Sequence, residues 1–321
     1  MKRQSVIWVI VGICALFAVP AAATDITITA GGTSGSWFIA GSAFQDGFAQ
    51  AITGSKFNVI PGGGAANPIR IDRGEAQVGF TYATNAKSAV SGTDPYKEKA
   101  DNIRAMANLQ ILQYLVFGVV EKVPLNSFEE WIQKKAALTI CPGPRSMGGW
   151  LTFRRMLKAY GASEKETENW GSKYIHAGWS ESVQQVLDGH AQALTTQAPV
   201  KVPFMVDLAQ ARPIKFLAIK DTVRQRMAQE YGYAAIDMPA DTYKGQPEPV
   251  PTVADSVVLL VNKDVPDDLV YHMVKVICEN KVKWENTHAM FKPFDPAKAF
   301  DTSIPLHPGA AKYYKEKGYM Q

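Results

Sequence analysis

Residues 26–81 alternate between strand-like and helix-like patterns, and this alternation narrows the choice of fold more than any other feature. Strand-like runs at 26–29, 57–60 and 76–81 are separated by a helical apolar pattern through residue 52 and by a short helix at 67–73. This order predicts a parallel sheet with helical crossovers. Ligand-binding groups are then expected on loops at the carboxyl ends of the strands.

A glycine-rich loop at residues 31–36 joins the first strand to the first helix. Glycines let a ligand approach the backbone, and the first turn of a helix offers unpaired amides with a partial positive charge, so the loop suits an anion. Thr33, Ser34 and Ser36 add hydroxyl groups. The spacing fits no dinucleotide fingerprint, phosphate loop or serine nucleophile elbow. An ordinary strand-to-helix turn without a ligand is the alternative interpretation of this loop alone.

The same design occurs again in the middle of the chain. A buried strand at 138–141 leads through a Pro- and Gly-rich loop at 142–149 into an amphipathic helix at 150–160. Two more polar loops, at 62–67 and 82–85, are expected at the same sheet edge as the first loop. We therefore predict two α/β lobes that face a shared cleft.

The rest of the chain continues the alternation. Further strands are predicted at 102–109, 113–120, 174–176, 191–195, 214–219 and 257–261. Further helices are predicted at 127–131, 180–187 with Ser180 as its cap, 223–231, 267–286 and after Pro308. Residues 242–251 are expected to form a loop.

Residues 1–23 have the features of a secretory signal peptide. Lys2 and Arg3 precede an apolar run at 6–19, and three alanines at 21–23 supply a small-residue cleavage pattern. The run is too short for a membrane span, and an uncleaved N-terminal anchor is the alternative. We predict a mature chain from about Thr24 that is exported to the periplasm.

Charge and metal-ligand spacing exclude several classes of function. The formal charge is +4, or +2 without Lys2 and Arg3, and no basic cluster suggests a nucleic-acid partner. The five histidines lack the spacing of metal ligands, so no metal is expected. No other cofactor is expected either. Cys141 and Cys278 are predicted to be buried thiols, because two distant cysteines make no disulfide framework. Cys141 also has no neighbouring base that would activate it as a nucleophile.

Five motifs, taken in order, resemble the TAXI family of solute-binding proteins, the extracytoplasmic receptors of TRAP transporters. They are Ile-Thr-x-Gly-Gly-Thr-Ser-Gly-Ser-Trp-Phe at 28–38, Gly-Gly-Gly-x-x-Asn at 62–67, Arg-Gly-Glu-Ala-Gln-Val-Gly-Phe at 73–80, Thr-Tyr-Lys-Gly at 242–245 followed by Pro-Thr-Val at 251–253, and Pro-Leu-His-Pro-Gly-Ala at 305–310 followed by Tyr-Tyr-Lys-Glu at 313–316. The resemblance covers essentially the whole chain after the signal peptide.

The resemblance implies an α/β, two-lobe periplasmic-binding-protein type II fold with hinge strands and a ligand cleft between the lobes. Lobe I is expected at 24–112 and again at 257–321, and lobe II at 113–256. The implied function is that of a monomeric receptor, not an enzyme. It would capture a small organic anion, a carboxylate or amino-acid-like solute, and deliver it to TRAP membrane permease subunits without ATP hydrolysis.

Carrying the family's binding positions onto this chain gives ligand-binding residues in both lobes. Lobe I contributes Thr33, Ser34, Ser36, Trp37, Gly64, Asn67, Tyr82 and Thr84. Lobe II contributes Ser146, Met147, Gly148, Gly149, Thr196, Gln197 and Ala198. Arg145 is a further candidate because arginine pairs with carboxylates in a bidentate manner, and a solvated loop arginine is its alternative.

The chain departs from the family's usual residues at four of these positions. Gly64, Met147 and Gly149 stand where hydroxyl residues are frequent, and Trp37 stands where tyrosine is usual. The pocket is therefore expected to be less polar and to suit an anion with an apolar or aromatic body. Two other functions remain open at this point, a ligand-sensing subunit of a two-component system and an exported hydrolase that uses Ser34 or Ser146.

Overall fold

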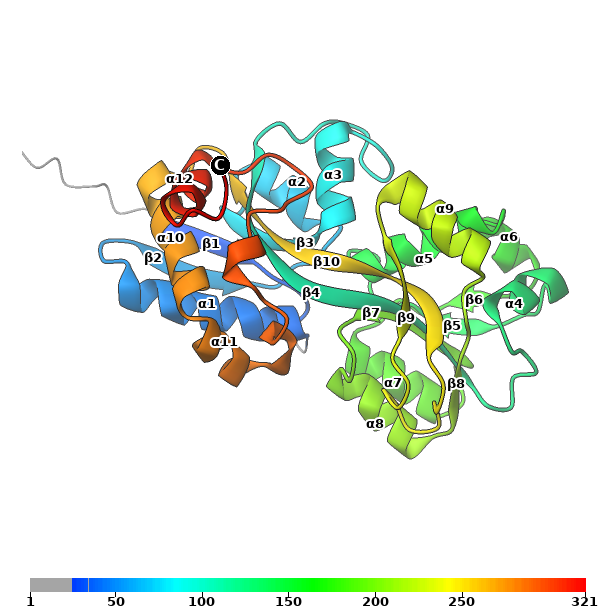
Figure 1. The fold of residues 1–321 in the computed structure, drawn as a ribbon. Coiled ribbons are helices and arrows are strands. Elements are labelled where there is room, and N and C mark those ends of the chain that lie inside the picture. Colours follow the sequence, from blue (N-terminus) through cyan, green and yellow to red (C-terminus); the bar gives the residue numbers. More distant parts are fainter. Residues whose placement is uncertain (1–24, 34) are drawn as a thin grey trace, which may run out of the picture.

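The strands that the structure describes form one mixed, ten-stranded sheet that runs through two α/β lobes (Figure 1). The computed structural model describes residues 25–33 and 35–321, so the predicted signal peptide lies outside the described residues. Eight strands follow in the order β2-β1-β3-β10-β4-β7-β5-β6, while β8 pairs with β4 and β9 pairs with β10. The two-lobe α/β architecture expected from the sequence is confirmed.

Lobe I begins with the predicted parallel strands and helical crossovers. Its first elements are β1 (Asp25–Thr29), α1 (Ser36–Ala51), β2 (Lys56–Ile60), α2 (Asn67–Asp72), β3 (Val78–Tyr82) and α3 (Ala83–Ser91). β1 lies between β2 and β3 and pairs with both in parallel. The loop predicted at 82–85 is wrong, because α3 begins directly after β3.

Lobe II repeats the strand, loop and helix order. Its elements are α4 (Phe128–Lys134), β5 (Thr139–Cys141), α5 (Gly148–Ala159), α6 (Glu164–Asn169), β6 (Lys173–Tyr174), α7 (Trp179–Leu187), β7 (Ala193–Ala198), α8 (Pro203–Ala211), β8 (Ile214–Phe216), α9 (Asp221–Tyr231) and β9 (Ala234–Met238). β5 pairs in parallel with β6 and β7. Gly178, rather than the predicted Ser180, is the N-cap of α7.

Two long antiparallel strands carry the chain from one lobe to the other (Figure 1). They are β4 (Ile103–Val120) and β10 (Val250–Asn262). In lobe I β10 pairs with β3, and in lobe II β4 pairs with β7. The prediction of two separate strands at 102–109 and 113–120 is wrong. The polar Gln110, with a φ of 54°, interrupts the apolar pattern but not the strand.

The C-terminal segment returns to lobe I. It contains α10 (Asp267–Glu279), α11 (Lys281–Thr287), the short 3-10 helices η1 (Ala289–Phe291) and η2 (Pro296–Lys298), and α12 (Pro308–Glu316). The single helix predicted at 267–286 is interrupted at Asn280, where φ is −114° and ψ is 30°. This change of direction brings the buried Trp284 ring to 5.0 Å from that of Phe44. In the part of the chain that the structure describes, no helix is long and apolar enough to span a membrane.

The buried apolar side chains form three clusters, and the residues of each cluster come from only one of the two lobes. One cluster draws its residues from 114–254, and the other two draw theirs from 26–111 and 257–314. We keep the lobe boundaries at 112/113 and 256/257 as a proposal, which this separation supports. Sequence patterns missed α6, α8 and β9 in lobe II.

Candidate functional site

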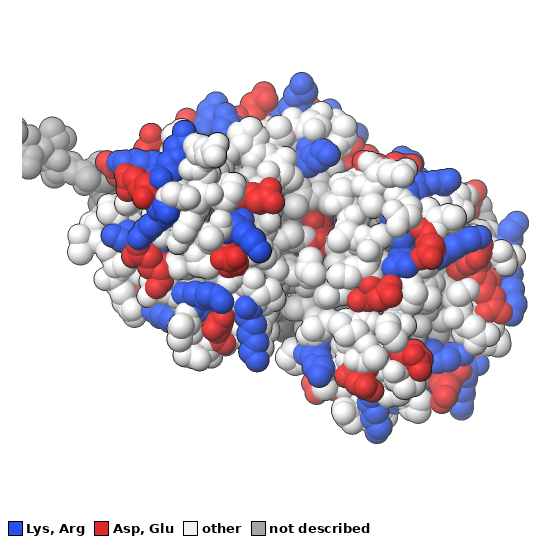
Figure 2. All heavy atoms as spheres, in the orientation of Figure 1, with Lys and Arg blue, Asp and Glu red and all other residues white. Residues whose placement is uncertain are grey.

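Loops from both lobes surround one small cavity near the carboxyl ends of β3 and β7. Its volume is about 50 Å³. The predicted site residues that line it are Ser36, Trp37, Gly64, Tyr82, Met147, Gly148, Gly149, Thr196, Gln197 and Ala198. On the outside, Figure 2 shows a groove between the lobes with acidic and basic side chains interspersed on both of them. The glycine-rich loops of the two lobes therefore do face each other.

The lobe I wall is built around the N-terminus of α1. Gly35 is the N-cap of α1, and no side chain caps the helix, so its first amides have no intrahelical or capping partner. The amide of Gly35 itself donates to the carbonyl of Gly32 over 2.8 Å. Trp37, which follows on the first turn, packs against Tyr82 with 4.8 Å between ring centroids. This wall therefore combines helix N-terminal amides with two aromatic rings.

The lobe II wall is built around the N-terminus of α5 in the same way. Met147 is the N-cap, and again no side chain caps the helix. Gly148 and Gly149 open the helix, and both line the cavity. A second face comes from Trp179 and Phe204, whose rings stack with centroids 5.0 Å apart. Two helix N-termini, one from each lobe, thus end at the same cavity, and their dipoles favour a negative charge there.

Backbone and ring contacts join the two lobes beside the cavity. A Cβ atom on Gly63 would lie 2.4 Å from the carbonyl oxygen of Ser146, which leaves room only for glycine. The Tyr82 hydroxyl donates to the carbonyl of Gln197 over 3.2 Å. Burial raises the pKa of Tyr82 well above its ordinary value, so this hydroxyl keeps its proton at neutral pH.

Two predicted ligand residues of lobe I are buried and hydrogen-bonded away from the cavity wall. The side-chain amide of Asn67 donates to the carbonyls of Ala30 and Phe80, each over 2.7 Å, and so ties β1 to β3. The Thr84 hydroxyl donates to the buried carboxylate of Asp255 over 2.6 Å. Both side chains support the walls, because their polar atoms are already occupied.

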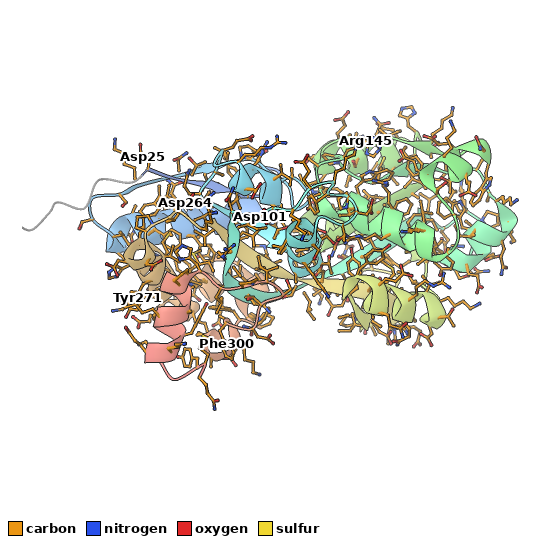
Figure 3. The ribbon with its side chains drawn as sticks, turned by 90° about the horizontal axis from the view of Figure 1, so that it is seen from above. Asp25, Asp101, Arg145, Asp264, Tyr271 and Phe300 are labelled. Carbon is orange, nitrogen blue, oxygen red and sulfur yellow. The ribbon has the colours of Figure 1, made fainter. Side chains whose placement is uncertain are left out.

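The remaining predicted site residues lie at the surface of the protein or are not among the residues that the structure describes. Arg145 is 58% exposed, lies at the outline of lobe II (Figure 3) and pairs with Glu164 over 2.8 Å. Thr33 and Ser146 are exposed and do not line the cavity. Ser34 is not among the described residues. The structure therefore does not bring Arg145 to the cavity wall.

Gln113, Val202 and Phe204 line the cavity but were missed from the sequence. Gln113 is 2% exposed and lies on β4, so a polar residue within an apolar strand was the available signal. Val202 and Phe204 lie just before and within α8, which the sequence patterns missed. Trp179, at the start of α7, also lines the cavity.

The titratable groups give no sign of a metal site or an activated nucleophile among the described residues. No group of three or more His, Cys, Asp or Glu side chains that could hold a metal ion is found there. Cys141 and Cys278 are buried free thiols, as predicted. Burial raises the pKa of Cys141 to about 11 and that of Cys278 to about 12, which disfavours the reactive thiolate.

Solved structures with this fold cover nearly the whole chain. They include a periplasmic transporter, with a TM-score of 0.52, 16% identity and coverage of 94% of this chain and 95% of that one. Malate-bound MatC from Rhodopseudomonas palustris has a TM-score of 0.54 at 11% identity and coverage of 92% and 97%. PhnD1 from Prochlorococcus marinus in complex with methylphosphonate has a TM-score of 0.53 at 12% identity and coverage of 92% and 96%. At these identities the similarity establishes the shared fold.

Family membership follows from a separate comparison with models of protein families. The matching model describes the NMT1-like family, and the match extends over residues 28–318. This span includes both lobes, the two crossing strands and every lining residue of the cavity. The chain therefore belongs to the NMT1-like family.

Proposed function

We propose that this chain is the periplasmic solute-binding receptor of a TRAP transporter. It captures a small organic anion between its lobes, acts as a monomer and delivers the solute to the membrane permease subunits. The family membership and the fold shared with a periplasmic transporter and with malate-bound MatC support a binding function. The ordered motifs that resemble TAXI proteins support the transporter type. No catalytic step is part of the proposal.

One observation carries the proposal. The uncapped N-termini of α1 and α5, one from each lobe, end at a single cavity. Helix N-terminal amides bind anions without any chemical change in the ligand. Since each lobe supplies one of the two helices, an anion between them would favour the closed arrangement of the lobes.

Ligand-dependent stabilisation of the mature chain tests the binding function. A ligand at one hundred times its dissociation constant adds about 2.7 kcal/mol to the free energy of unfolding. We expect one class of carboxylate to raise the thermal midpoint of residues 24–321, and native mass spectrometry to show one molecule bound per monomer. A broad panel of organic acids that leaves the midpoint unchanged would contradict the proposal.

The transporter type needs a separate experiment with the membrane subunits. Proteoliposomes that contain the TRAP permease should accumulate the bound solute when an ion gradient and this receptor are both present, without ATP. Accumulation that requires ATP would contradict a TRAP system. A receptor that binds the solute but supports no transport, and that instead changes the activity of a sensor kinase, would point to the sensing alternative.

The hydrolase alternative finds no support among the described residues at the cavity, and Ser34, one of its two candidate nucleophiles, lies outside them. Ser146 is exposed and does not line the cavity, and no histidine is among the lining residues that the structure describes. A hydroxyl without a neighbouring base is a weak nucleophile.

A further inference from the structure

Among the described residues, no Asp, Glu, Lys, Arg or His lines the cavity. Among the described residues that line it, the side chains are aromatic, aliphatic, amide, hydroxyl or hydrogen. Trp37, Tyr82, Trp179 and Phe204 provide aromatic surface, and Met147 adds a thioether. A charged group of a ligand therefore meets only helix N-terminal amides and neutral hydrogen-bonding side chains.

Three side chains on this wall each have a buried polar atom without a hydrogen-bond partner. These atoms are Nε1 of Trp37, Nε2 of Gln113 and Oγ1 of Thr196, and their residues are 6%, 2% and 1% exposed. The indole and carboxamide nitrogens can only donate hydrogen bonds, and the threonine hydroxyl can donate one. A buried donor without a partner is costly, so these groups are suited to a ligand with several acceptor atoms.

The neighbouring Gln197 side chain differs from these three, because both of its polar atoms already have hydrogen-bond partners within the protein. Its Oε1 accepts from the Thr152 hydroxyl over 2.5 Å, and its Nε2 donates to the carbonyl of Gln113 over 3.4 Å. The Thr152 hydroxyl in turn lies 3.0 Å from that of Tyr233. The free hydrogen-bonding capacity of the wall is therefore biased toward donors.

A donor-rich wall with no ionised side chain discriminates between kinds of organic acid. A carboxylate only accepts hydrogen bonds, so it suits these donors and the two helix N-termini. An α-amino acid brings an ammonium group, and no carboxylate on the described wall would pair with it. Burying an unpaired charge is strongly unfavourable. A dicarboxylate would bury a second negative charge without a cationic partner.

The size of the cavity limits the rest of the ligand. One water needs roughly 10–15 Å³ of such space, so a cavity of about 50 Å³ accommodates about three to five atoms of that size. Two of these atoms are the carboxylate oxygens, so this corresponds to an acid of about one to three carbons. The aromatic side chains of both lobes would then contact its short hydrocarbon part.

From this geometry we infer that the cavity selects short-chain monocarboxylates, of about one to three carbons, that carry no amino group. The inference rests on the proposed function, because it names the solute class of the same site. Trp37, Gln113 and Thr196 supply side-chain hydrogen bonds to the carboxylate, and the amides of α1 and α5 supply the rest. The aromatic walls exclude water from the hydrocarbon part.

A panel of matched acids tests the selectivity by calorimetric titration and thermal midpoint. Acetate and propionate should bind, whereas alanine, succinate and benzoate should bind at least about tenfold more weakly. Tighter binding of alanine, succinate or benzoate would overturn the inference and leave the receptor function standing. If no acid of the panel or of a broader anion library binds, both the inference and the proposed function fail.

A pair of adjacent threonines provides a matched control for the site. Thr195 and Thr196 both lie on β7, are 1% exposed and have an unpartnered hydroxyl, but only Thr196 lines the cavity. Thr196→Val should weaken propionate binding by about tenfold or more, whereas Thr195→Val should change it less than about twofold. Equal effects of the two substitutions would overturn the assigned contact.

A second pair of variants covers the case in which the threonine variants fail to fold. Trp37→Phe keeps an aromatic ring and removes the indole donor. Trp170, outside the cavity, gives the control Trp170→Phe. We expect only Trp37→Phe to weaken propionate binding, by about tenfold. Unchanged propionate affinity in Trp37→Phe would overturn the role of the indole.

Discussion

At the residue scale, the absence of a side chain at Gly148 lets the two lobes approach each other. A Cβ atom there would lie 2.0 Å from Cε2 of Tyr82, which belongs to the opposite lobe. Tyr82 in turn is fixed by its contact with Trp37 and by its hydrogen bond to the Gln197 carbonyl. Only glycine therefore lets the two lobes come this close at position 148. This requirement is separate from the position of Gly148 at the N-terminus of α5.

Gly148→Ala should weaken ligand binding by about tenfold or more, because overpacking of a close contact costs about 1–3 kcal/mol and this contact exists only when the lobes are closed. Calorimetric titration of the bound acid measures the change. Gly178→Ala is the control, since a Cβ atom on Gly178 meets nothing within 4 Å. Equal affinities in the Gly148→Ala variant and the unmodified protein would show that closure does not need this glycine.

Asp255 is a buried carboxyl that should make stability depend on pH. Burial raises its pKa from 3.8 to about 7, although hydrogen bonds from Thr84 oppose the shift. Between about pH 4 and pH 7 the folded protein then binds a proton that the unfolded chain has released, so stability falls as pH rises through this window.

Replacing Asp255 by Asn should remove this dependence. The free energy of unfolding of the unmodified protein should fall relative to that of Asp255→Asn by up to about 1.4 kcal/mol per pH unit between pH 4 and pH 7. Urea unfolding at several pH values measures both proteins. Parallel pH profiles would contradict a raised pKa at this carboxyl.

At the element scale, helix α5 connects the cavity to a second contact between the lobes. Its N-terminus forms the lobe II wall, and two turns later Arg155, 1% exposed, extends toward lobe I. The Arg155 guanidinium donates to the Ser88 hydroxyl and to the Asp94 carbonyl, each over 2.8 Å. It also lies 4.5 Å from the centre of the Tyr231 ring. One helix therefore carries both the amides that end at the cavity and a polar link between the two lobes.

Arg155→Met should favour the open arrangement and weaken ligand binding by about tenfold or more, because it removes charge-assisted hydrogen bonds worth about 1.5–3 kcal/mol each. Calorimetric titration with the bound acid measures this. Arg154→Met is the matched control, since Arg154 is exposed on the same helix. If both variants bind equally well, the link does not contribute to closure.

At the scale of the whole molecule, only β4 and β10 continue from one lobe into the other within the described chain, and each lobe has its own core (Figure 1). Such a connection permits rotation of one lobe relative to the other with little loss of buried apolar contact. The cavity of about 50 Å³ lies between walls from both lobes, so separation of the lobes would open it further to a ligand.

We expect the ligand-free protein to be more open in solution than the ligand-bound protein. Small-angle X-ray scattering should therefore show a smaller radius of gyration after saturation with the bound acid, at constant molecular mass. The Arg155→Met variant should need a higher ligand concentration to reach the same compact state. A radius of gyration that does not change on saturation would contradict lobe closure.

The sequence predicted most of the elements but not how far some of them extend. Strand β4 appeared as two runs because Gln110 and Gln113 interrupt the apolar pattern of a strand whose two ends lie in different lobes. The helix at 267–286 appeared continuous because the turn at Asn280 depends on Trp284 packing against Phe44, a contact distant in sequence. Local periodicity carries no information about either pairing.

The sequence by itself determined the alternating strand and helix order, the two glycine-rich helix starts and the two buried thiols, because each depends on residue type and short-range spacing. Only the tertiary structure decided which polar side chains reach the cavity. Asn67 and Thr84 are held by partners in the walls, Gln113 faces the cavity from a crossing strand, and Arg145 pairs at the surface. The physical reason is that a side chain's hydrogen-bond partners are set by residues far away along the chain, which meet only when the lobes fold and close.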